Sequence, residues 1–246
     1  MTVREFLTNL AKFALLLTLV VQPIFFAHAQ AAEDGVNFRR IYLARHGQRP
    51  PKGDPALTEL GRAQARLLGE RLKSESFKGR IYASPYLRTV ETAVQIARVV
   101  GGKVLLNPLI QERTRKPGKP DIAGLSQDEL SKIFPGFISE QPALPYPWVY
   151  DDNSGEMLLK RVERAIDDAL AKGGDFILVG HKATVLAGLK ILGARAGVEL
   201  DAKVWNCTLA YFVADAAGNV KFVGFGTGFI PPPMITDNTK APLLEN

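Results

Sequence analysis

From residue 40 onward, short apolar runs alternate with stretches in which apolar residues recur every three or four positions. The short runs predict strands and the recurring pattern predicts helices. The predicted strands cover residues 40–44, 80–83, 103–106 and 176–179. This alternation favours an α/β fold, a three-layer sandwich with a mainly parallel central sheet and helices on both faces. Residues 176–179 are apolar throughout, which is typical of a central strand buried on both faces.

Capping residues predict where the helices between these strands begin and end. Thr58 is a candidate N-cap for a helix that carries leucine and alanine along one face. Ser84 is predicted to cap the following helix, with Pro85 at its first position. Gly101 and Gly102 are expected to end that helix.

Residues 113–153 interrupt the regular pattern and are rich in proline, glycine, aromatic and charged residues. We interpret this segment as a long, lid-like excursion with one short helix near residues 126–133. Beyond it, residues 205–214 and 220–225 predict a hairpin that closes the sheet. The prolines at 231–233 predict an extended tail.

Residues 1–29 have the pattern of an export signal. Two positive charges flank the start of a short apolar stretch, and Ala27-His28-Ala29 has the small-x-small pattern of a cleavage site. Residues 30–37 then form a polar linker and residues 38–246 a single domain. This organisation predicts a periplasmic or secreted protein with no stable membrane span after cleavage. An uncleaved membrane anchor is the alternative interpretation.

Composition narrows the possible partners. The formal net charge is +6, which suits anionic partners in general. The sequence has no run of five or more lysine or arginine residues and no nucleic-acid-binding motif, so we expect no nucleic-acid partner. Cys207 is the one cysteine and lies in an apolar stretch, where a small core residue is expected rather than a nucleophile.

Two histidines follow predicted strands. His46 comes directly after the first strand, and His181 comes one glycine after residues 176–179. Ligands of open α/β sheets bind beyond the carboxyl ends of the strands, so both histidines are expected at the functional edge. A single histidine there could simply bond to the backbone, but two histidines near several arginines favour a functional site.

Three arginines are predicted at the same edge. Arg45 and Arg49 flank His46, and Arg88 lies in the first turn of the helix after the second strand. Guanidinium groups match phosphate oxygens in two-point contacts, and helix N-termini add backbone N–H donors. The pattern therefore predicts a site for a doubly charged anion. Alternatively, Arg88 could pair with Glu91 or Glu59.

Four ordered motifs resemble those of the histidine phosphatase superfamily, which includes cofactor-dependent phosphoglycerate mutases and acid phosphatases. Arg45-His46-Gly47 resembles its signature, and residues 57–65 resemble its LTxxGxxQA stretch. Residues 84–93 are similar to SPLxRxxQTA, and residues 179–181 to the segment with the second histidine. Residues 45–51 also match the RHGxRxP form of the acid-phosphatase branch, although the chain is short for that branch. We therefore expect a fold like that of phosphoglycerate mutase.

The resemblance implies a role for each of these residues. His46 would attack phosphorus and become phosphohistidine, while Arg45, Arg88 and His181 would hold the phosphate oxygens. Arg49 would be a further phosphate contact. No metal and no other cofactor is expected, because side chains supply the positive charge.

The leaving oxygen needs a proton donor. Members that resemble phosphoglycerate mutase place a glutamate after the third strand, and Glu112 fits that position. The acid-phosphatase branch uses an aspartate directly after the second histidine, where this chain has Lys182. The alternative is that Glu112 is an exposed residue that pairs with Arg113 or Arg115.

Together these observations predict a metal-independent phosphomonoesterase that acts on a small phosphorylated substrate outside the cytoplasm. Two alternatives remain open. One is a mutase-like phosphotransferase, and the other is a non-catalytic module that binds phosphate or another anion.

Overall fold

The computed structural model describes residues 38–112, 124–142 and 155–237. The predicted signal and linker lie outside these ranges, as do parts of the predicted excursion. The excursion contains one short helix in its described part, as expected. The elements, in chain order, are β1 (Arg39–Arg45), α2 (Glu59–Ser74), β2 (Arg80–Ala83), α3 (Leu87–Val100), β3 (Val104–Leu106), η1 (Pro108–Ile110), α4 (Gln127–Ile133), α5 (Gly155–Ala171), β4 (Phe176–Gly180), α6 (Lys182–Arg195), β5 (Leu209–Ala214), β6 (Val220–Gly226) and η2 (Pro232–Met234).

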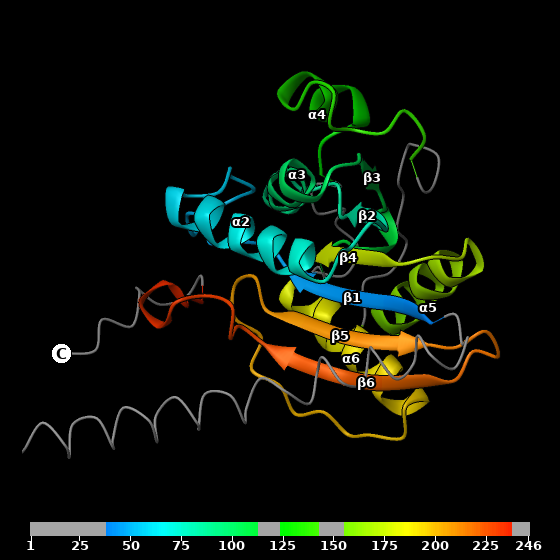
Figure 1. The fold of residues 1–246 in the computed structure, drawn as a ribbon. Coiled ribbons are helices and arrows are strands. Elements are labelled where there is room, and N and C mark those ends of the chain that lie inside the picture. The colour runs from blue at the N-terminus through cyan, green and yellow to red at the C-terminus, as the bar shows by residue number, and fades with distance from the viewer. Residues whose placement is uncertain (1–37, 113–123, 143–154, 238–246) are drawn as a thin grey trace, which may run out of the picture.

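A single mixed sheet forms the centre of the described part, with strand order β3-β2-β4-β1-β5-β6 (Figure 1). The first four strands of this order are parallel, and β5 and β6 add an antiparallel pair at one edge. The α/β fold with a mainly parallel sheet and the closing hairpin are therefore confirmed. The apolar strand β4 lies between β2 and β1, which explains why all five of its residues are buried.

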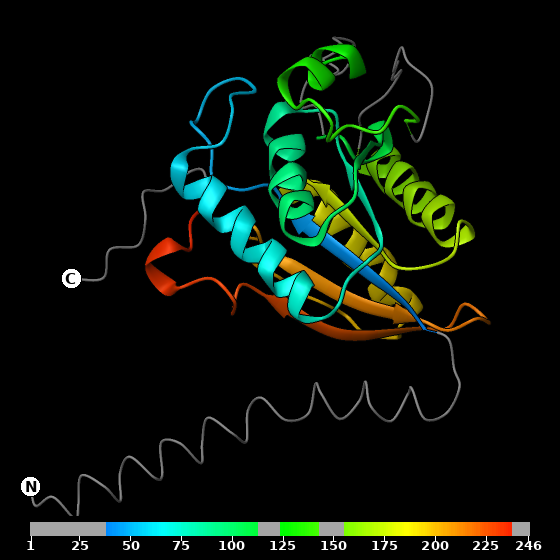
Figure 2. The ribbon, with the colours of Figure 1, turned by 45° about the horizontal axis from the view of Figure 1, so that its top comes forward.

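Helices cover the sheet on both sides and create two hydrophobic cores (Figure 2). One core joins α2 and α3 to one face, and the other joins α5 and α6 to the opposite face. Alternate residues of the parallel strands supply the two cores; Ile41 and Tyr42 of β1, for example, belong to different ones. The packing on both faces fixes the ends of the parallel strands relative to one another.

Helix α2 approaches the turn after β1 very closely because two glycines meet there. A β-carbon on Gly61 would lie 2.0 Å from the backbone oxygen of Gln48, and one on Gly47 would lie 2.5 Å from the oxygen of Gly61. Any side chain at either position would push the helix away from the turn. Thr58 caps α2 as predicted, since its side chain accepts a hydrogen bond from the Gly61 amide.

The start of α3 differs from the prediction. The helix begins at Leu87 rather than at Pro85, and its N-cap residue Tyr86 makes no capping hydrogen bond with its side chain. A distant residue replaces the local cap, because Asp54 accepts a hydrogen bond from the Leu87 amide at 2.7 Å. Ser84 instead hydrogen-bonds to His181.

Two predictions near the C-terminus are also corrected. The strand expected from residue 205 begins at Leu209, because Trp205 and Thr208 form a turn in which the Thr208 amide donates to the Trp205 carbonyl at 3.2 Å. The tail prolines, predicted to be extended, contribute to the 3-10 helix η2. Proline's fixed φ angle is compatible with both conformations, and the local hydrogen bond from Met234 to Pro231 favours the 3-10 form.

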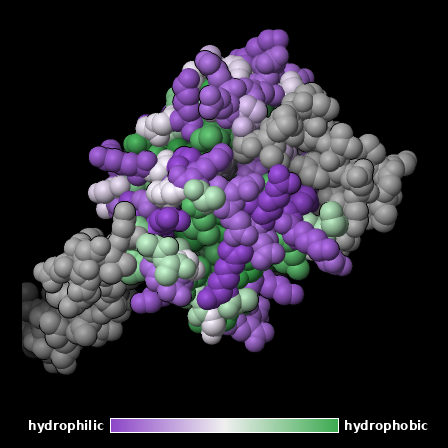
Figure 3. Space-filling view, turned by 90° about the vertical axis from the view of Figure 1, so that its right-hand side faces the viewer, coloured by the Kyte–Doolittle hydropathy of each residue, from purple (hydrophilic) through white to green (hydrophobic). Residues whose placement is uncertain are grey.

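The side of the molecule seen in Figure 3 is mainly hydrophilic, with hydrophobic residues visible between the polar ones. Among the described residues, no helix combines the length and the apolar character that crossing a membrane requires.

Candidate active site

The parallel pairing of β1 with β4 brings the two histidines together. In this register Arg45 lies opposite Gly180, and the His46 amide donates to the Gly180 carbonyl at 3.0 Å. Each histidine is the residue that follows its strand, so both lie at the carboxyl edge of the sheet. Their ring centroids are 5.6 Å apart, and both side chains are buried.

The hydrogen bond from His46 to Gly47 sets which ring nitrogen carries the proton. Nδ1 of His46 lies 2.8 Å from the carbonyl oxygen of Gly47. A carbonyl only accepts, so Nδ1 must donate, and Nε2 of the neutral ring keeps the lone pair. The carbonyl of His46 itself accepts from the Asn206 side chain at 3.1 Å and from the Cys207 amide at 3.3 Å. The Nδ1 bond therefore orients the imidazole with Nε2 as its basic atom, and the two bonds to the carbonyl hold the backbone of His46 in place.

His46 is neutral in this environment. Burial lowers its pKa well below the usual 6.5, and the positive charges of Arg88 and Arg45 lower this pKa further. The burial of Cys207 has a related effect, because it raises the pKa of the thiol and keeps it protonated. Cys207 is thus a core residue, as predicted, and His46 is the candidate nucleophile.

His181 is held by two neighbours and is also neutral. Its Nε2 lies 2.9 Å from the Ser84 hydroxyl, and its Nδ1 lies 3.2 Å from Nη2 of Arg88. A guanidinium only donates, so Nδ1 accepts from Arg88 and Nε2 donates to Ser84. Burial lowers the pKa of His181 well below 6.5, with further contributions from Arg88 and His46.

Three arginines surround these histidines, as the sequence predicted. Arg45 donates to the Val204 carbonyl at 2.9 Å and to Asp237 at 3.1 Å, while Arg49 donates to the Pro50 carbonyl at 2.7 Å. Each of the three arginines still has one N–H group, on Nε, that is not used. The Nε atoms of the three side chains are buried and have no hydrogen-bond partner among the described residues: Arg45, Arg49 and Arg88. Such orphaned donors around one histidine make a site for an oxyanion.

Arg88 contacts Asp54 rather than the acidic partners considered from the sequence. Its Nη1 lies 2.7 Å from Oδ1 of Asp54. Glu59 and Glu91 instead pair with Arg62. The expectation that the start of α3 offers backbone donors to a ligand is not met at Leu87, because that amide donates to Asp54.

Glu112 lies at the border of this cluster. One of its carboxylate oxygens is 3.7 Å from Nδ1 of His181, and its side chain is 36% exposed. Burial lowers the pKa of Arg49, and the negative charge of Glu112 acts in the opposite direction. The position combines contact with the site and access to solvent, which a proton donor needs. The alternative partners Arg113 and Arg115 lie outside the described residues.

All six residues predicted from the sequence therefore come together: Arg45, His46, Arg49, Arg88, Glu112 and His181. Sequence reasoning missed Asp54 and Asp237, which pair with two of the arginines, and it assigned Ser84 to a different role. No motif marks either aspartate. The described part of the chain has no cluster of three or more His, Cys, Asp or Glu residues suited to a metal ion.

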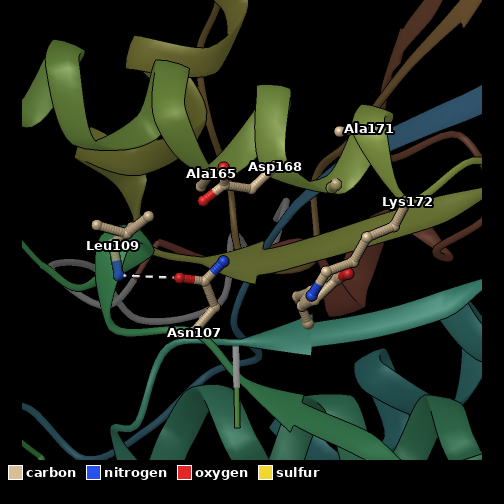
Figure 4. A pocket seen from close by; sticks show the side chains of 8 residues that line it. Asn107, Leu109, Ala165, Asp168, Ala171 and Lys172 are labelled. Carbon is tan, nitrogen blue, oxygen red and sulfur yellow. Dashed lines mark hydrogen bonds between the residues drawn. The ribbon is translucent and has the colours of Figure 1, made fainter. Parts of the chain in front are cut away.

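A cavity of about 290 Å³ lies apart from this cluster, between α5, β2 and the segment that follows β3 (Figure 4). Tyr82, Asn107 and Leu109 line one side, and Asn107 accepts a hydrogen bond from the Leu109 amide at 3.0 Å. None of the six site residues lines it. The candidate active site is therefore identified by the cluster of six site residues and not by this cavity.

Comparisons with known proteins show the family to which this chain belongs. The sequence profile of the histidine phosphatase superfamily (branch 1) matches residues 41–220. A protein of Photorhabdus laumondii named probable phosphoglycerate mutase GpmB is 30% identical over 187 residues, which span 70% of this chain and 83% of that protein. The putative phosphoserine phosphatase 2 of Hydrogenobacter thermophilus is 29% identical over 181 residues, 68% of this chain and 83% of that one.

Solved structures show the same fold. The ecdysone phosphate phosphatase of Bombix mori, in complex with tungstate, aligns with a TM-score of 0.58 at 21% identity and covers 79% of this chain and 94% of its own.

We predict that Arg88→Met raises the pKa of His46, because the substitution removes the nearby charge that most disfavours the imidazolium form. Nitrogen-15 NMR of the imidazole rings, titrated from pH 8 to pH 4, measures this shift. The matched control is Arg98→Met, which removes an exposed charge from the same helix and should leave the titration unchanged. A wild-type His46 that titrates near 6.5, or an Arg88→Met variant with no upward shift, would contradict the electrostatic account.

Proposed function

Because this chain belongs to branch 1 of the histidine phosphatase superfamily, we propose that it hydrolyses a small phosphate monoester through a phosphohistidine at His46. The observation that carries the proposal is the bond from Nδ1 of His46 to the Gly47 carbonyl, with three orphaned guanidinium Nε atoms nearby. A neutral nucleophile and fixed positive charge are what attack on an anionic phosphorus requires.

The first step transfers the phosphoryl group. Nε2 of His46 forms a bond to phosphorus while the ester P–O bond breaks, and Glu112 gives a proton to the leaving oxygen. Arg45, Arg49 and Arg88 stabilise the charge on the phosphoryl oxygens. His181 contributes once the bound phosphate dianion offsets the arginine charges that help to lower its pKa, because a proton taken from solvent onto Nδ1 then lets that atom donate to an oxygen.

The second step restores the enzyme. Water attacks the phosphohistidine, the N–P bond breaks, and Glu112 accepts a proton from the attacking water. Inorganic phosphate leaves and His46 returns to its neutral form. Arginine side chains supply the positive charge in both steps, so we propose that no metal ion takes part.

We also propose that the substrate is an exported or envelope phosphate ester. The support is the signal-like pattern of residues 1–29, which argues against a glycolytic mutase with cytoplasmic substrates. Intact-mass analysis of the protein recovered from its producing cell tests this: a chain that begins at Gln30 agrees with export, and a chain that retains residues 1–29 contradicts cleavage.

His46→Ala should abolish release of phosphate from an aryl phosphate in the presence of a chelator, with kcat reduced by about a thousandfold or more because the nucleophile is lost. A phosphate-release assay of wild type and variant measures this. Transfer to an added alcohol or sugar phosphate with little net release would indicate the phosphotransferase alternative. Tight phosphate binding by the wild type without turnover would indicate the anion-binding alternative.

Glu112→Gln should affect substrates according to their leaving groups. The loss in kcat/KM should be about a hundredfold or more for an alkyl phosphate, whose leaving oxygen needs a proton, and below about tenfold for a nitrophenyl phosphate. Glu140→Gln, at an exposed glutamate that contacts none of the six site residues in the described structure, is the control and should change neither value. Equal losses on both substrates would mean that Glu112 is not the proton donor.

A further inference from the structure

Asp54 connects an exposed loop to the candidate active site. The residues before it, Pro50–Gly53, are exposed, whereas the Asp54 side chain is 14% exposed. Its Oδ2 accepts from the Leu87 amide at 2.7 Å, and its Oδ1 accepts from Nη1 of Arg88 at 2.7 Å and from the Arg88 amide at 3.5 Å. One carboxylate thus holds both the start of α3 and the side chain of its second residue.

These contacts fix the orientation of the Arg88 guanidinium. Asp54 holds Nη1, and the plane of the group lies over the Tyr86 ring with Cζ 4.5 Å from the ring centroid. Nη2 points to His181 at 3.2 Å, and Nε is buried without a hydrogen-bond partner in the described part of the chain. The edge formed by Nε and Nη2 is the two-donor edge that matches an oxyanion.

We propose that Asp54 is a positioning residue, which makes Arg88 present its Nε–Nη2 edge to the phosphoryl group. The proposal rests on the proposed function, in which Arg88 binds that group. Asp54 does not touch the substrate and acts through Arg88.

Positioning by Asp54 and simple electrostatic repulsion predict opposite changes in phosphate affinity when the carboxylate is removed. A carboxylate close to a phosphate site repels the phosphate, so removal of its charge alone would strengthen anion binding. Loss of positioning has the opposite effect, because a guanidinium that can rotate must be ordered again when the anion binds. The direction of the change in phosphate affinity therefore decides between the two.

The test combines Asp54→Asn, Arg88→Met and the double variant. Asparagine keeps the size of aspartate, but an NH2 donor replaces one of the two oxygens. Because the Leu87 amide and the Arg88 side chain bind different oxygens of Asp54, one of these two donors would then face another donor. We expect Asp54→Asn to weaken binding of inorganic phosphate by about tenfold and to lower kcat/KM on an aryl phosphate by about tenfold to a hundredfold. In the Arg88→Met background the same substitution should change either quantity by less than about twofold.

Calorimetry with inorganic phosphate and steady-state kinetics measure these quantities on the full chain. Tighter phosphate binding by Asp54→Asn would overturn the proposal, and so would equal losses with and without Arg88. Because phosphate binding needs no turnover, a wild type that binds phosphate but releases none from esters would contradict the proposed function and leave the Asp54 comparison decisive.

Two further variants control for folding. Asp167→Asn removes an aspartate that pairs with Arg195 at the same 2.7 Å on an exposed face, and it should leave phosphate affinity unchanged. Asp54→Ser removes the carboxylate, so it cannot hold both the Leu87 amide and the guanidinium. Its unfolding temperature, measured beside its phosphate affinity, separates a folding defect from lost positioning: we expect folded protein with weakened phosphate binding, and wild-type affinity would overturn the proposal.

Discussion

The parallel pairing of β1 with β4 decides where the chemistry takes place. In its register, Arg45 lies opposite Gly180, so the next residue of each segment is a histidine. A shift of one position would place one imidazole on the other side of its strand. His46 and His181, which are 135 positions apart in the chain, become neighbours through backbone hydrogen bonds that involve neither side chain. Two cores, one on each face of the sheet, stabilise this register.

Burial and charge then act together on the same group. Three guanidinium groups in one buried cluster repel one another, and Asp54 and Asp237 offset part of that repulsion through ion pairs with Arg88 and Arg45. Burial lowers the pKa of His46, and the positive charge that remains lowers this pKa further and keeps the lone pair available. In the proposed mechanism, that charge also stabilises the negative charge on the phosphoryl oxygens. The same arginine charges therefore help to keep His46 neutral and, in the proposed mechanism, stabilise the phosphoryl oxygens.

Local patterns in the sequence predicted most of the fold and the six residues of the candidate site. Strand periodicity located β1 and β4, and a rule about strand ends placed His46 and His181. The contacts that were missed join distant segments: Asp54 lies 34 positions from Arg88, and Asp237 lies 192 positions from Arg45. Ser84 had the local pattern of a helix cap, but a tertiary partner 97 positions away, His181, takes its hydroxyl. Propensity describes neighbours along the chain, whereas these contacts depend on the packed fold.

The most direct measurement is the identity of the phosphorylated nitrogen. Phosphorus-31 and nitrogen-15 NMR of the protein, labelled at histidine and trapped during turnover, can assign the N–P bond to one ring atom. The bond from Nδ1 to the Gly47 carbonyl leaves Nε2 as the nucleophile, so we expect phosphorus on Nε2 of His46. Phosphorus on Nδ1 of His46, or on His181, would contradict the account.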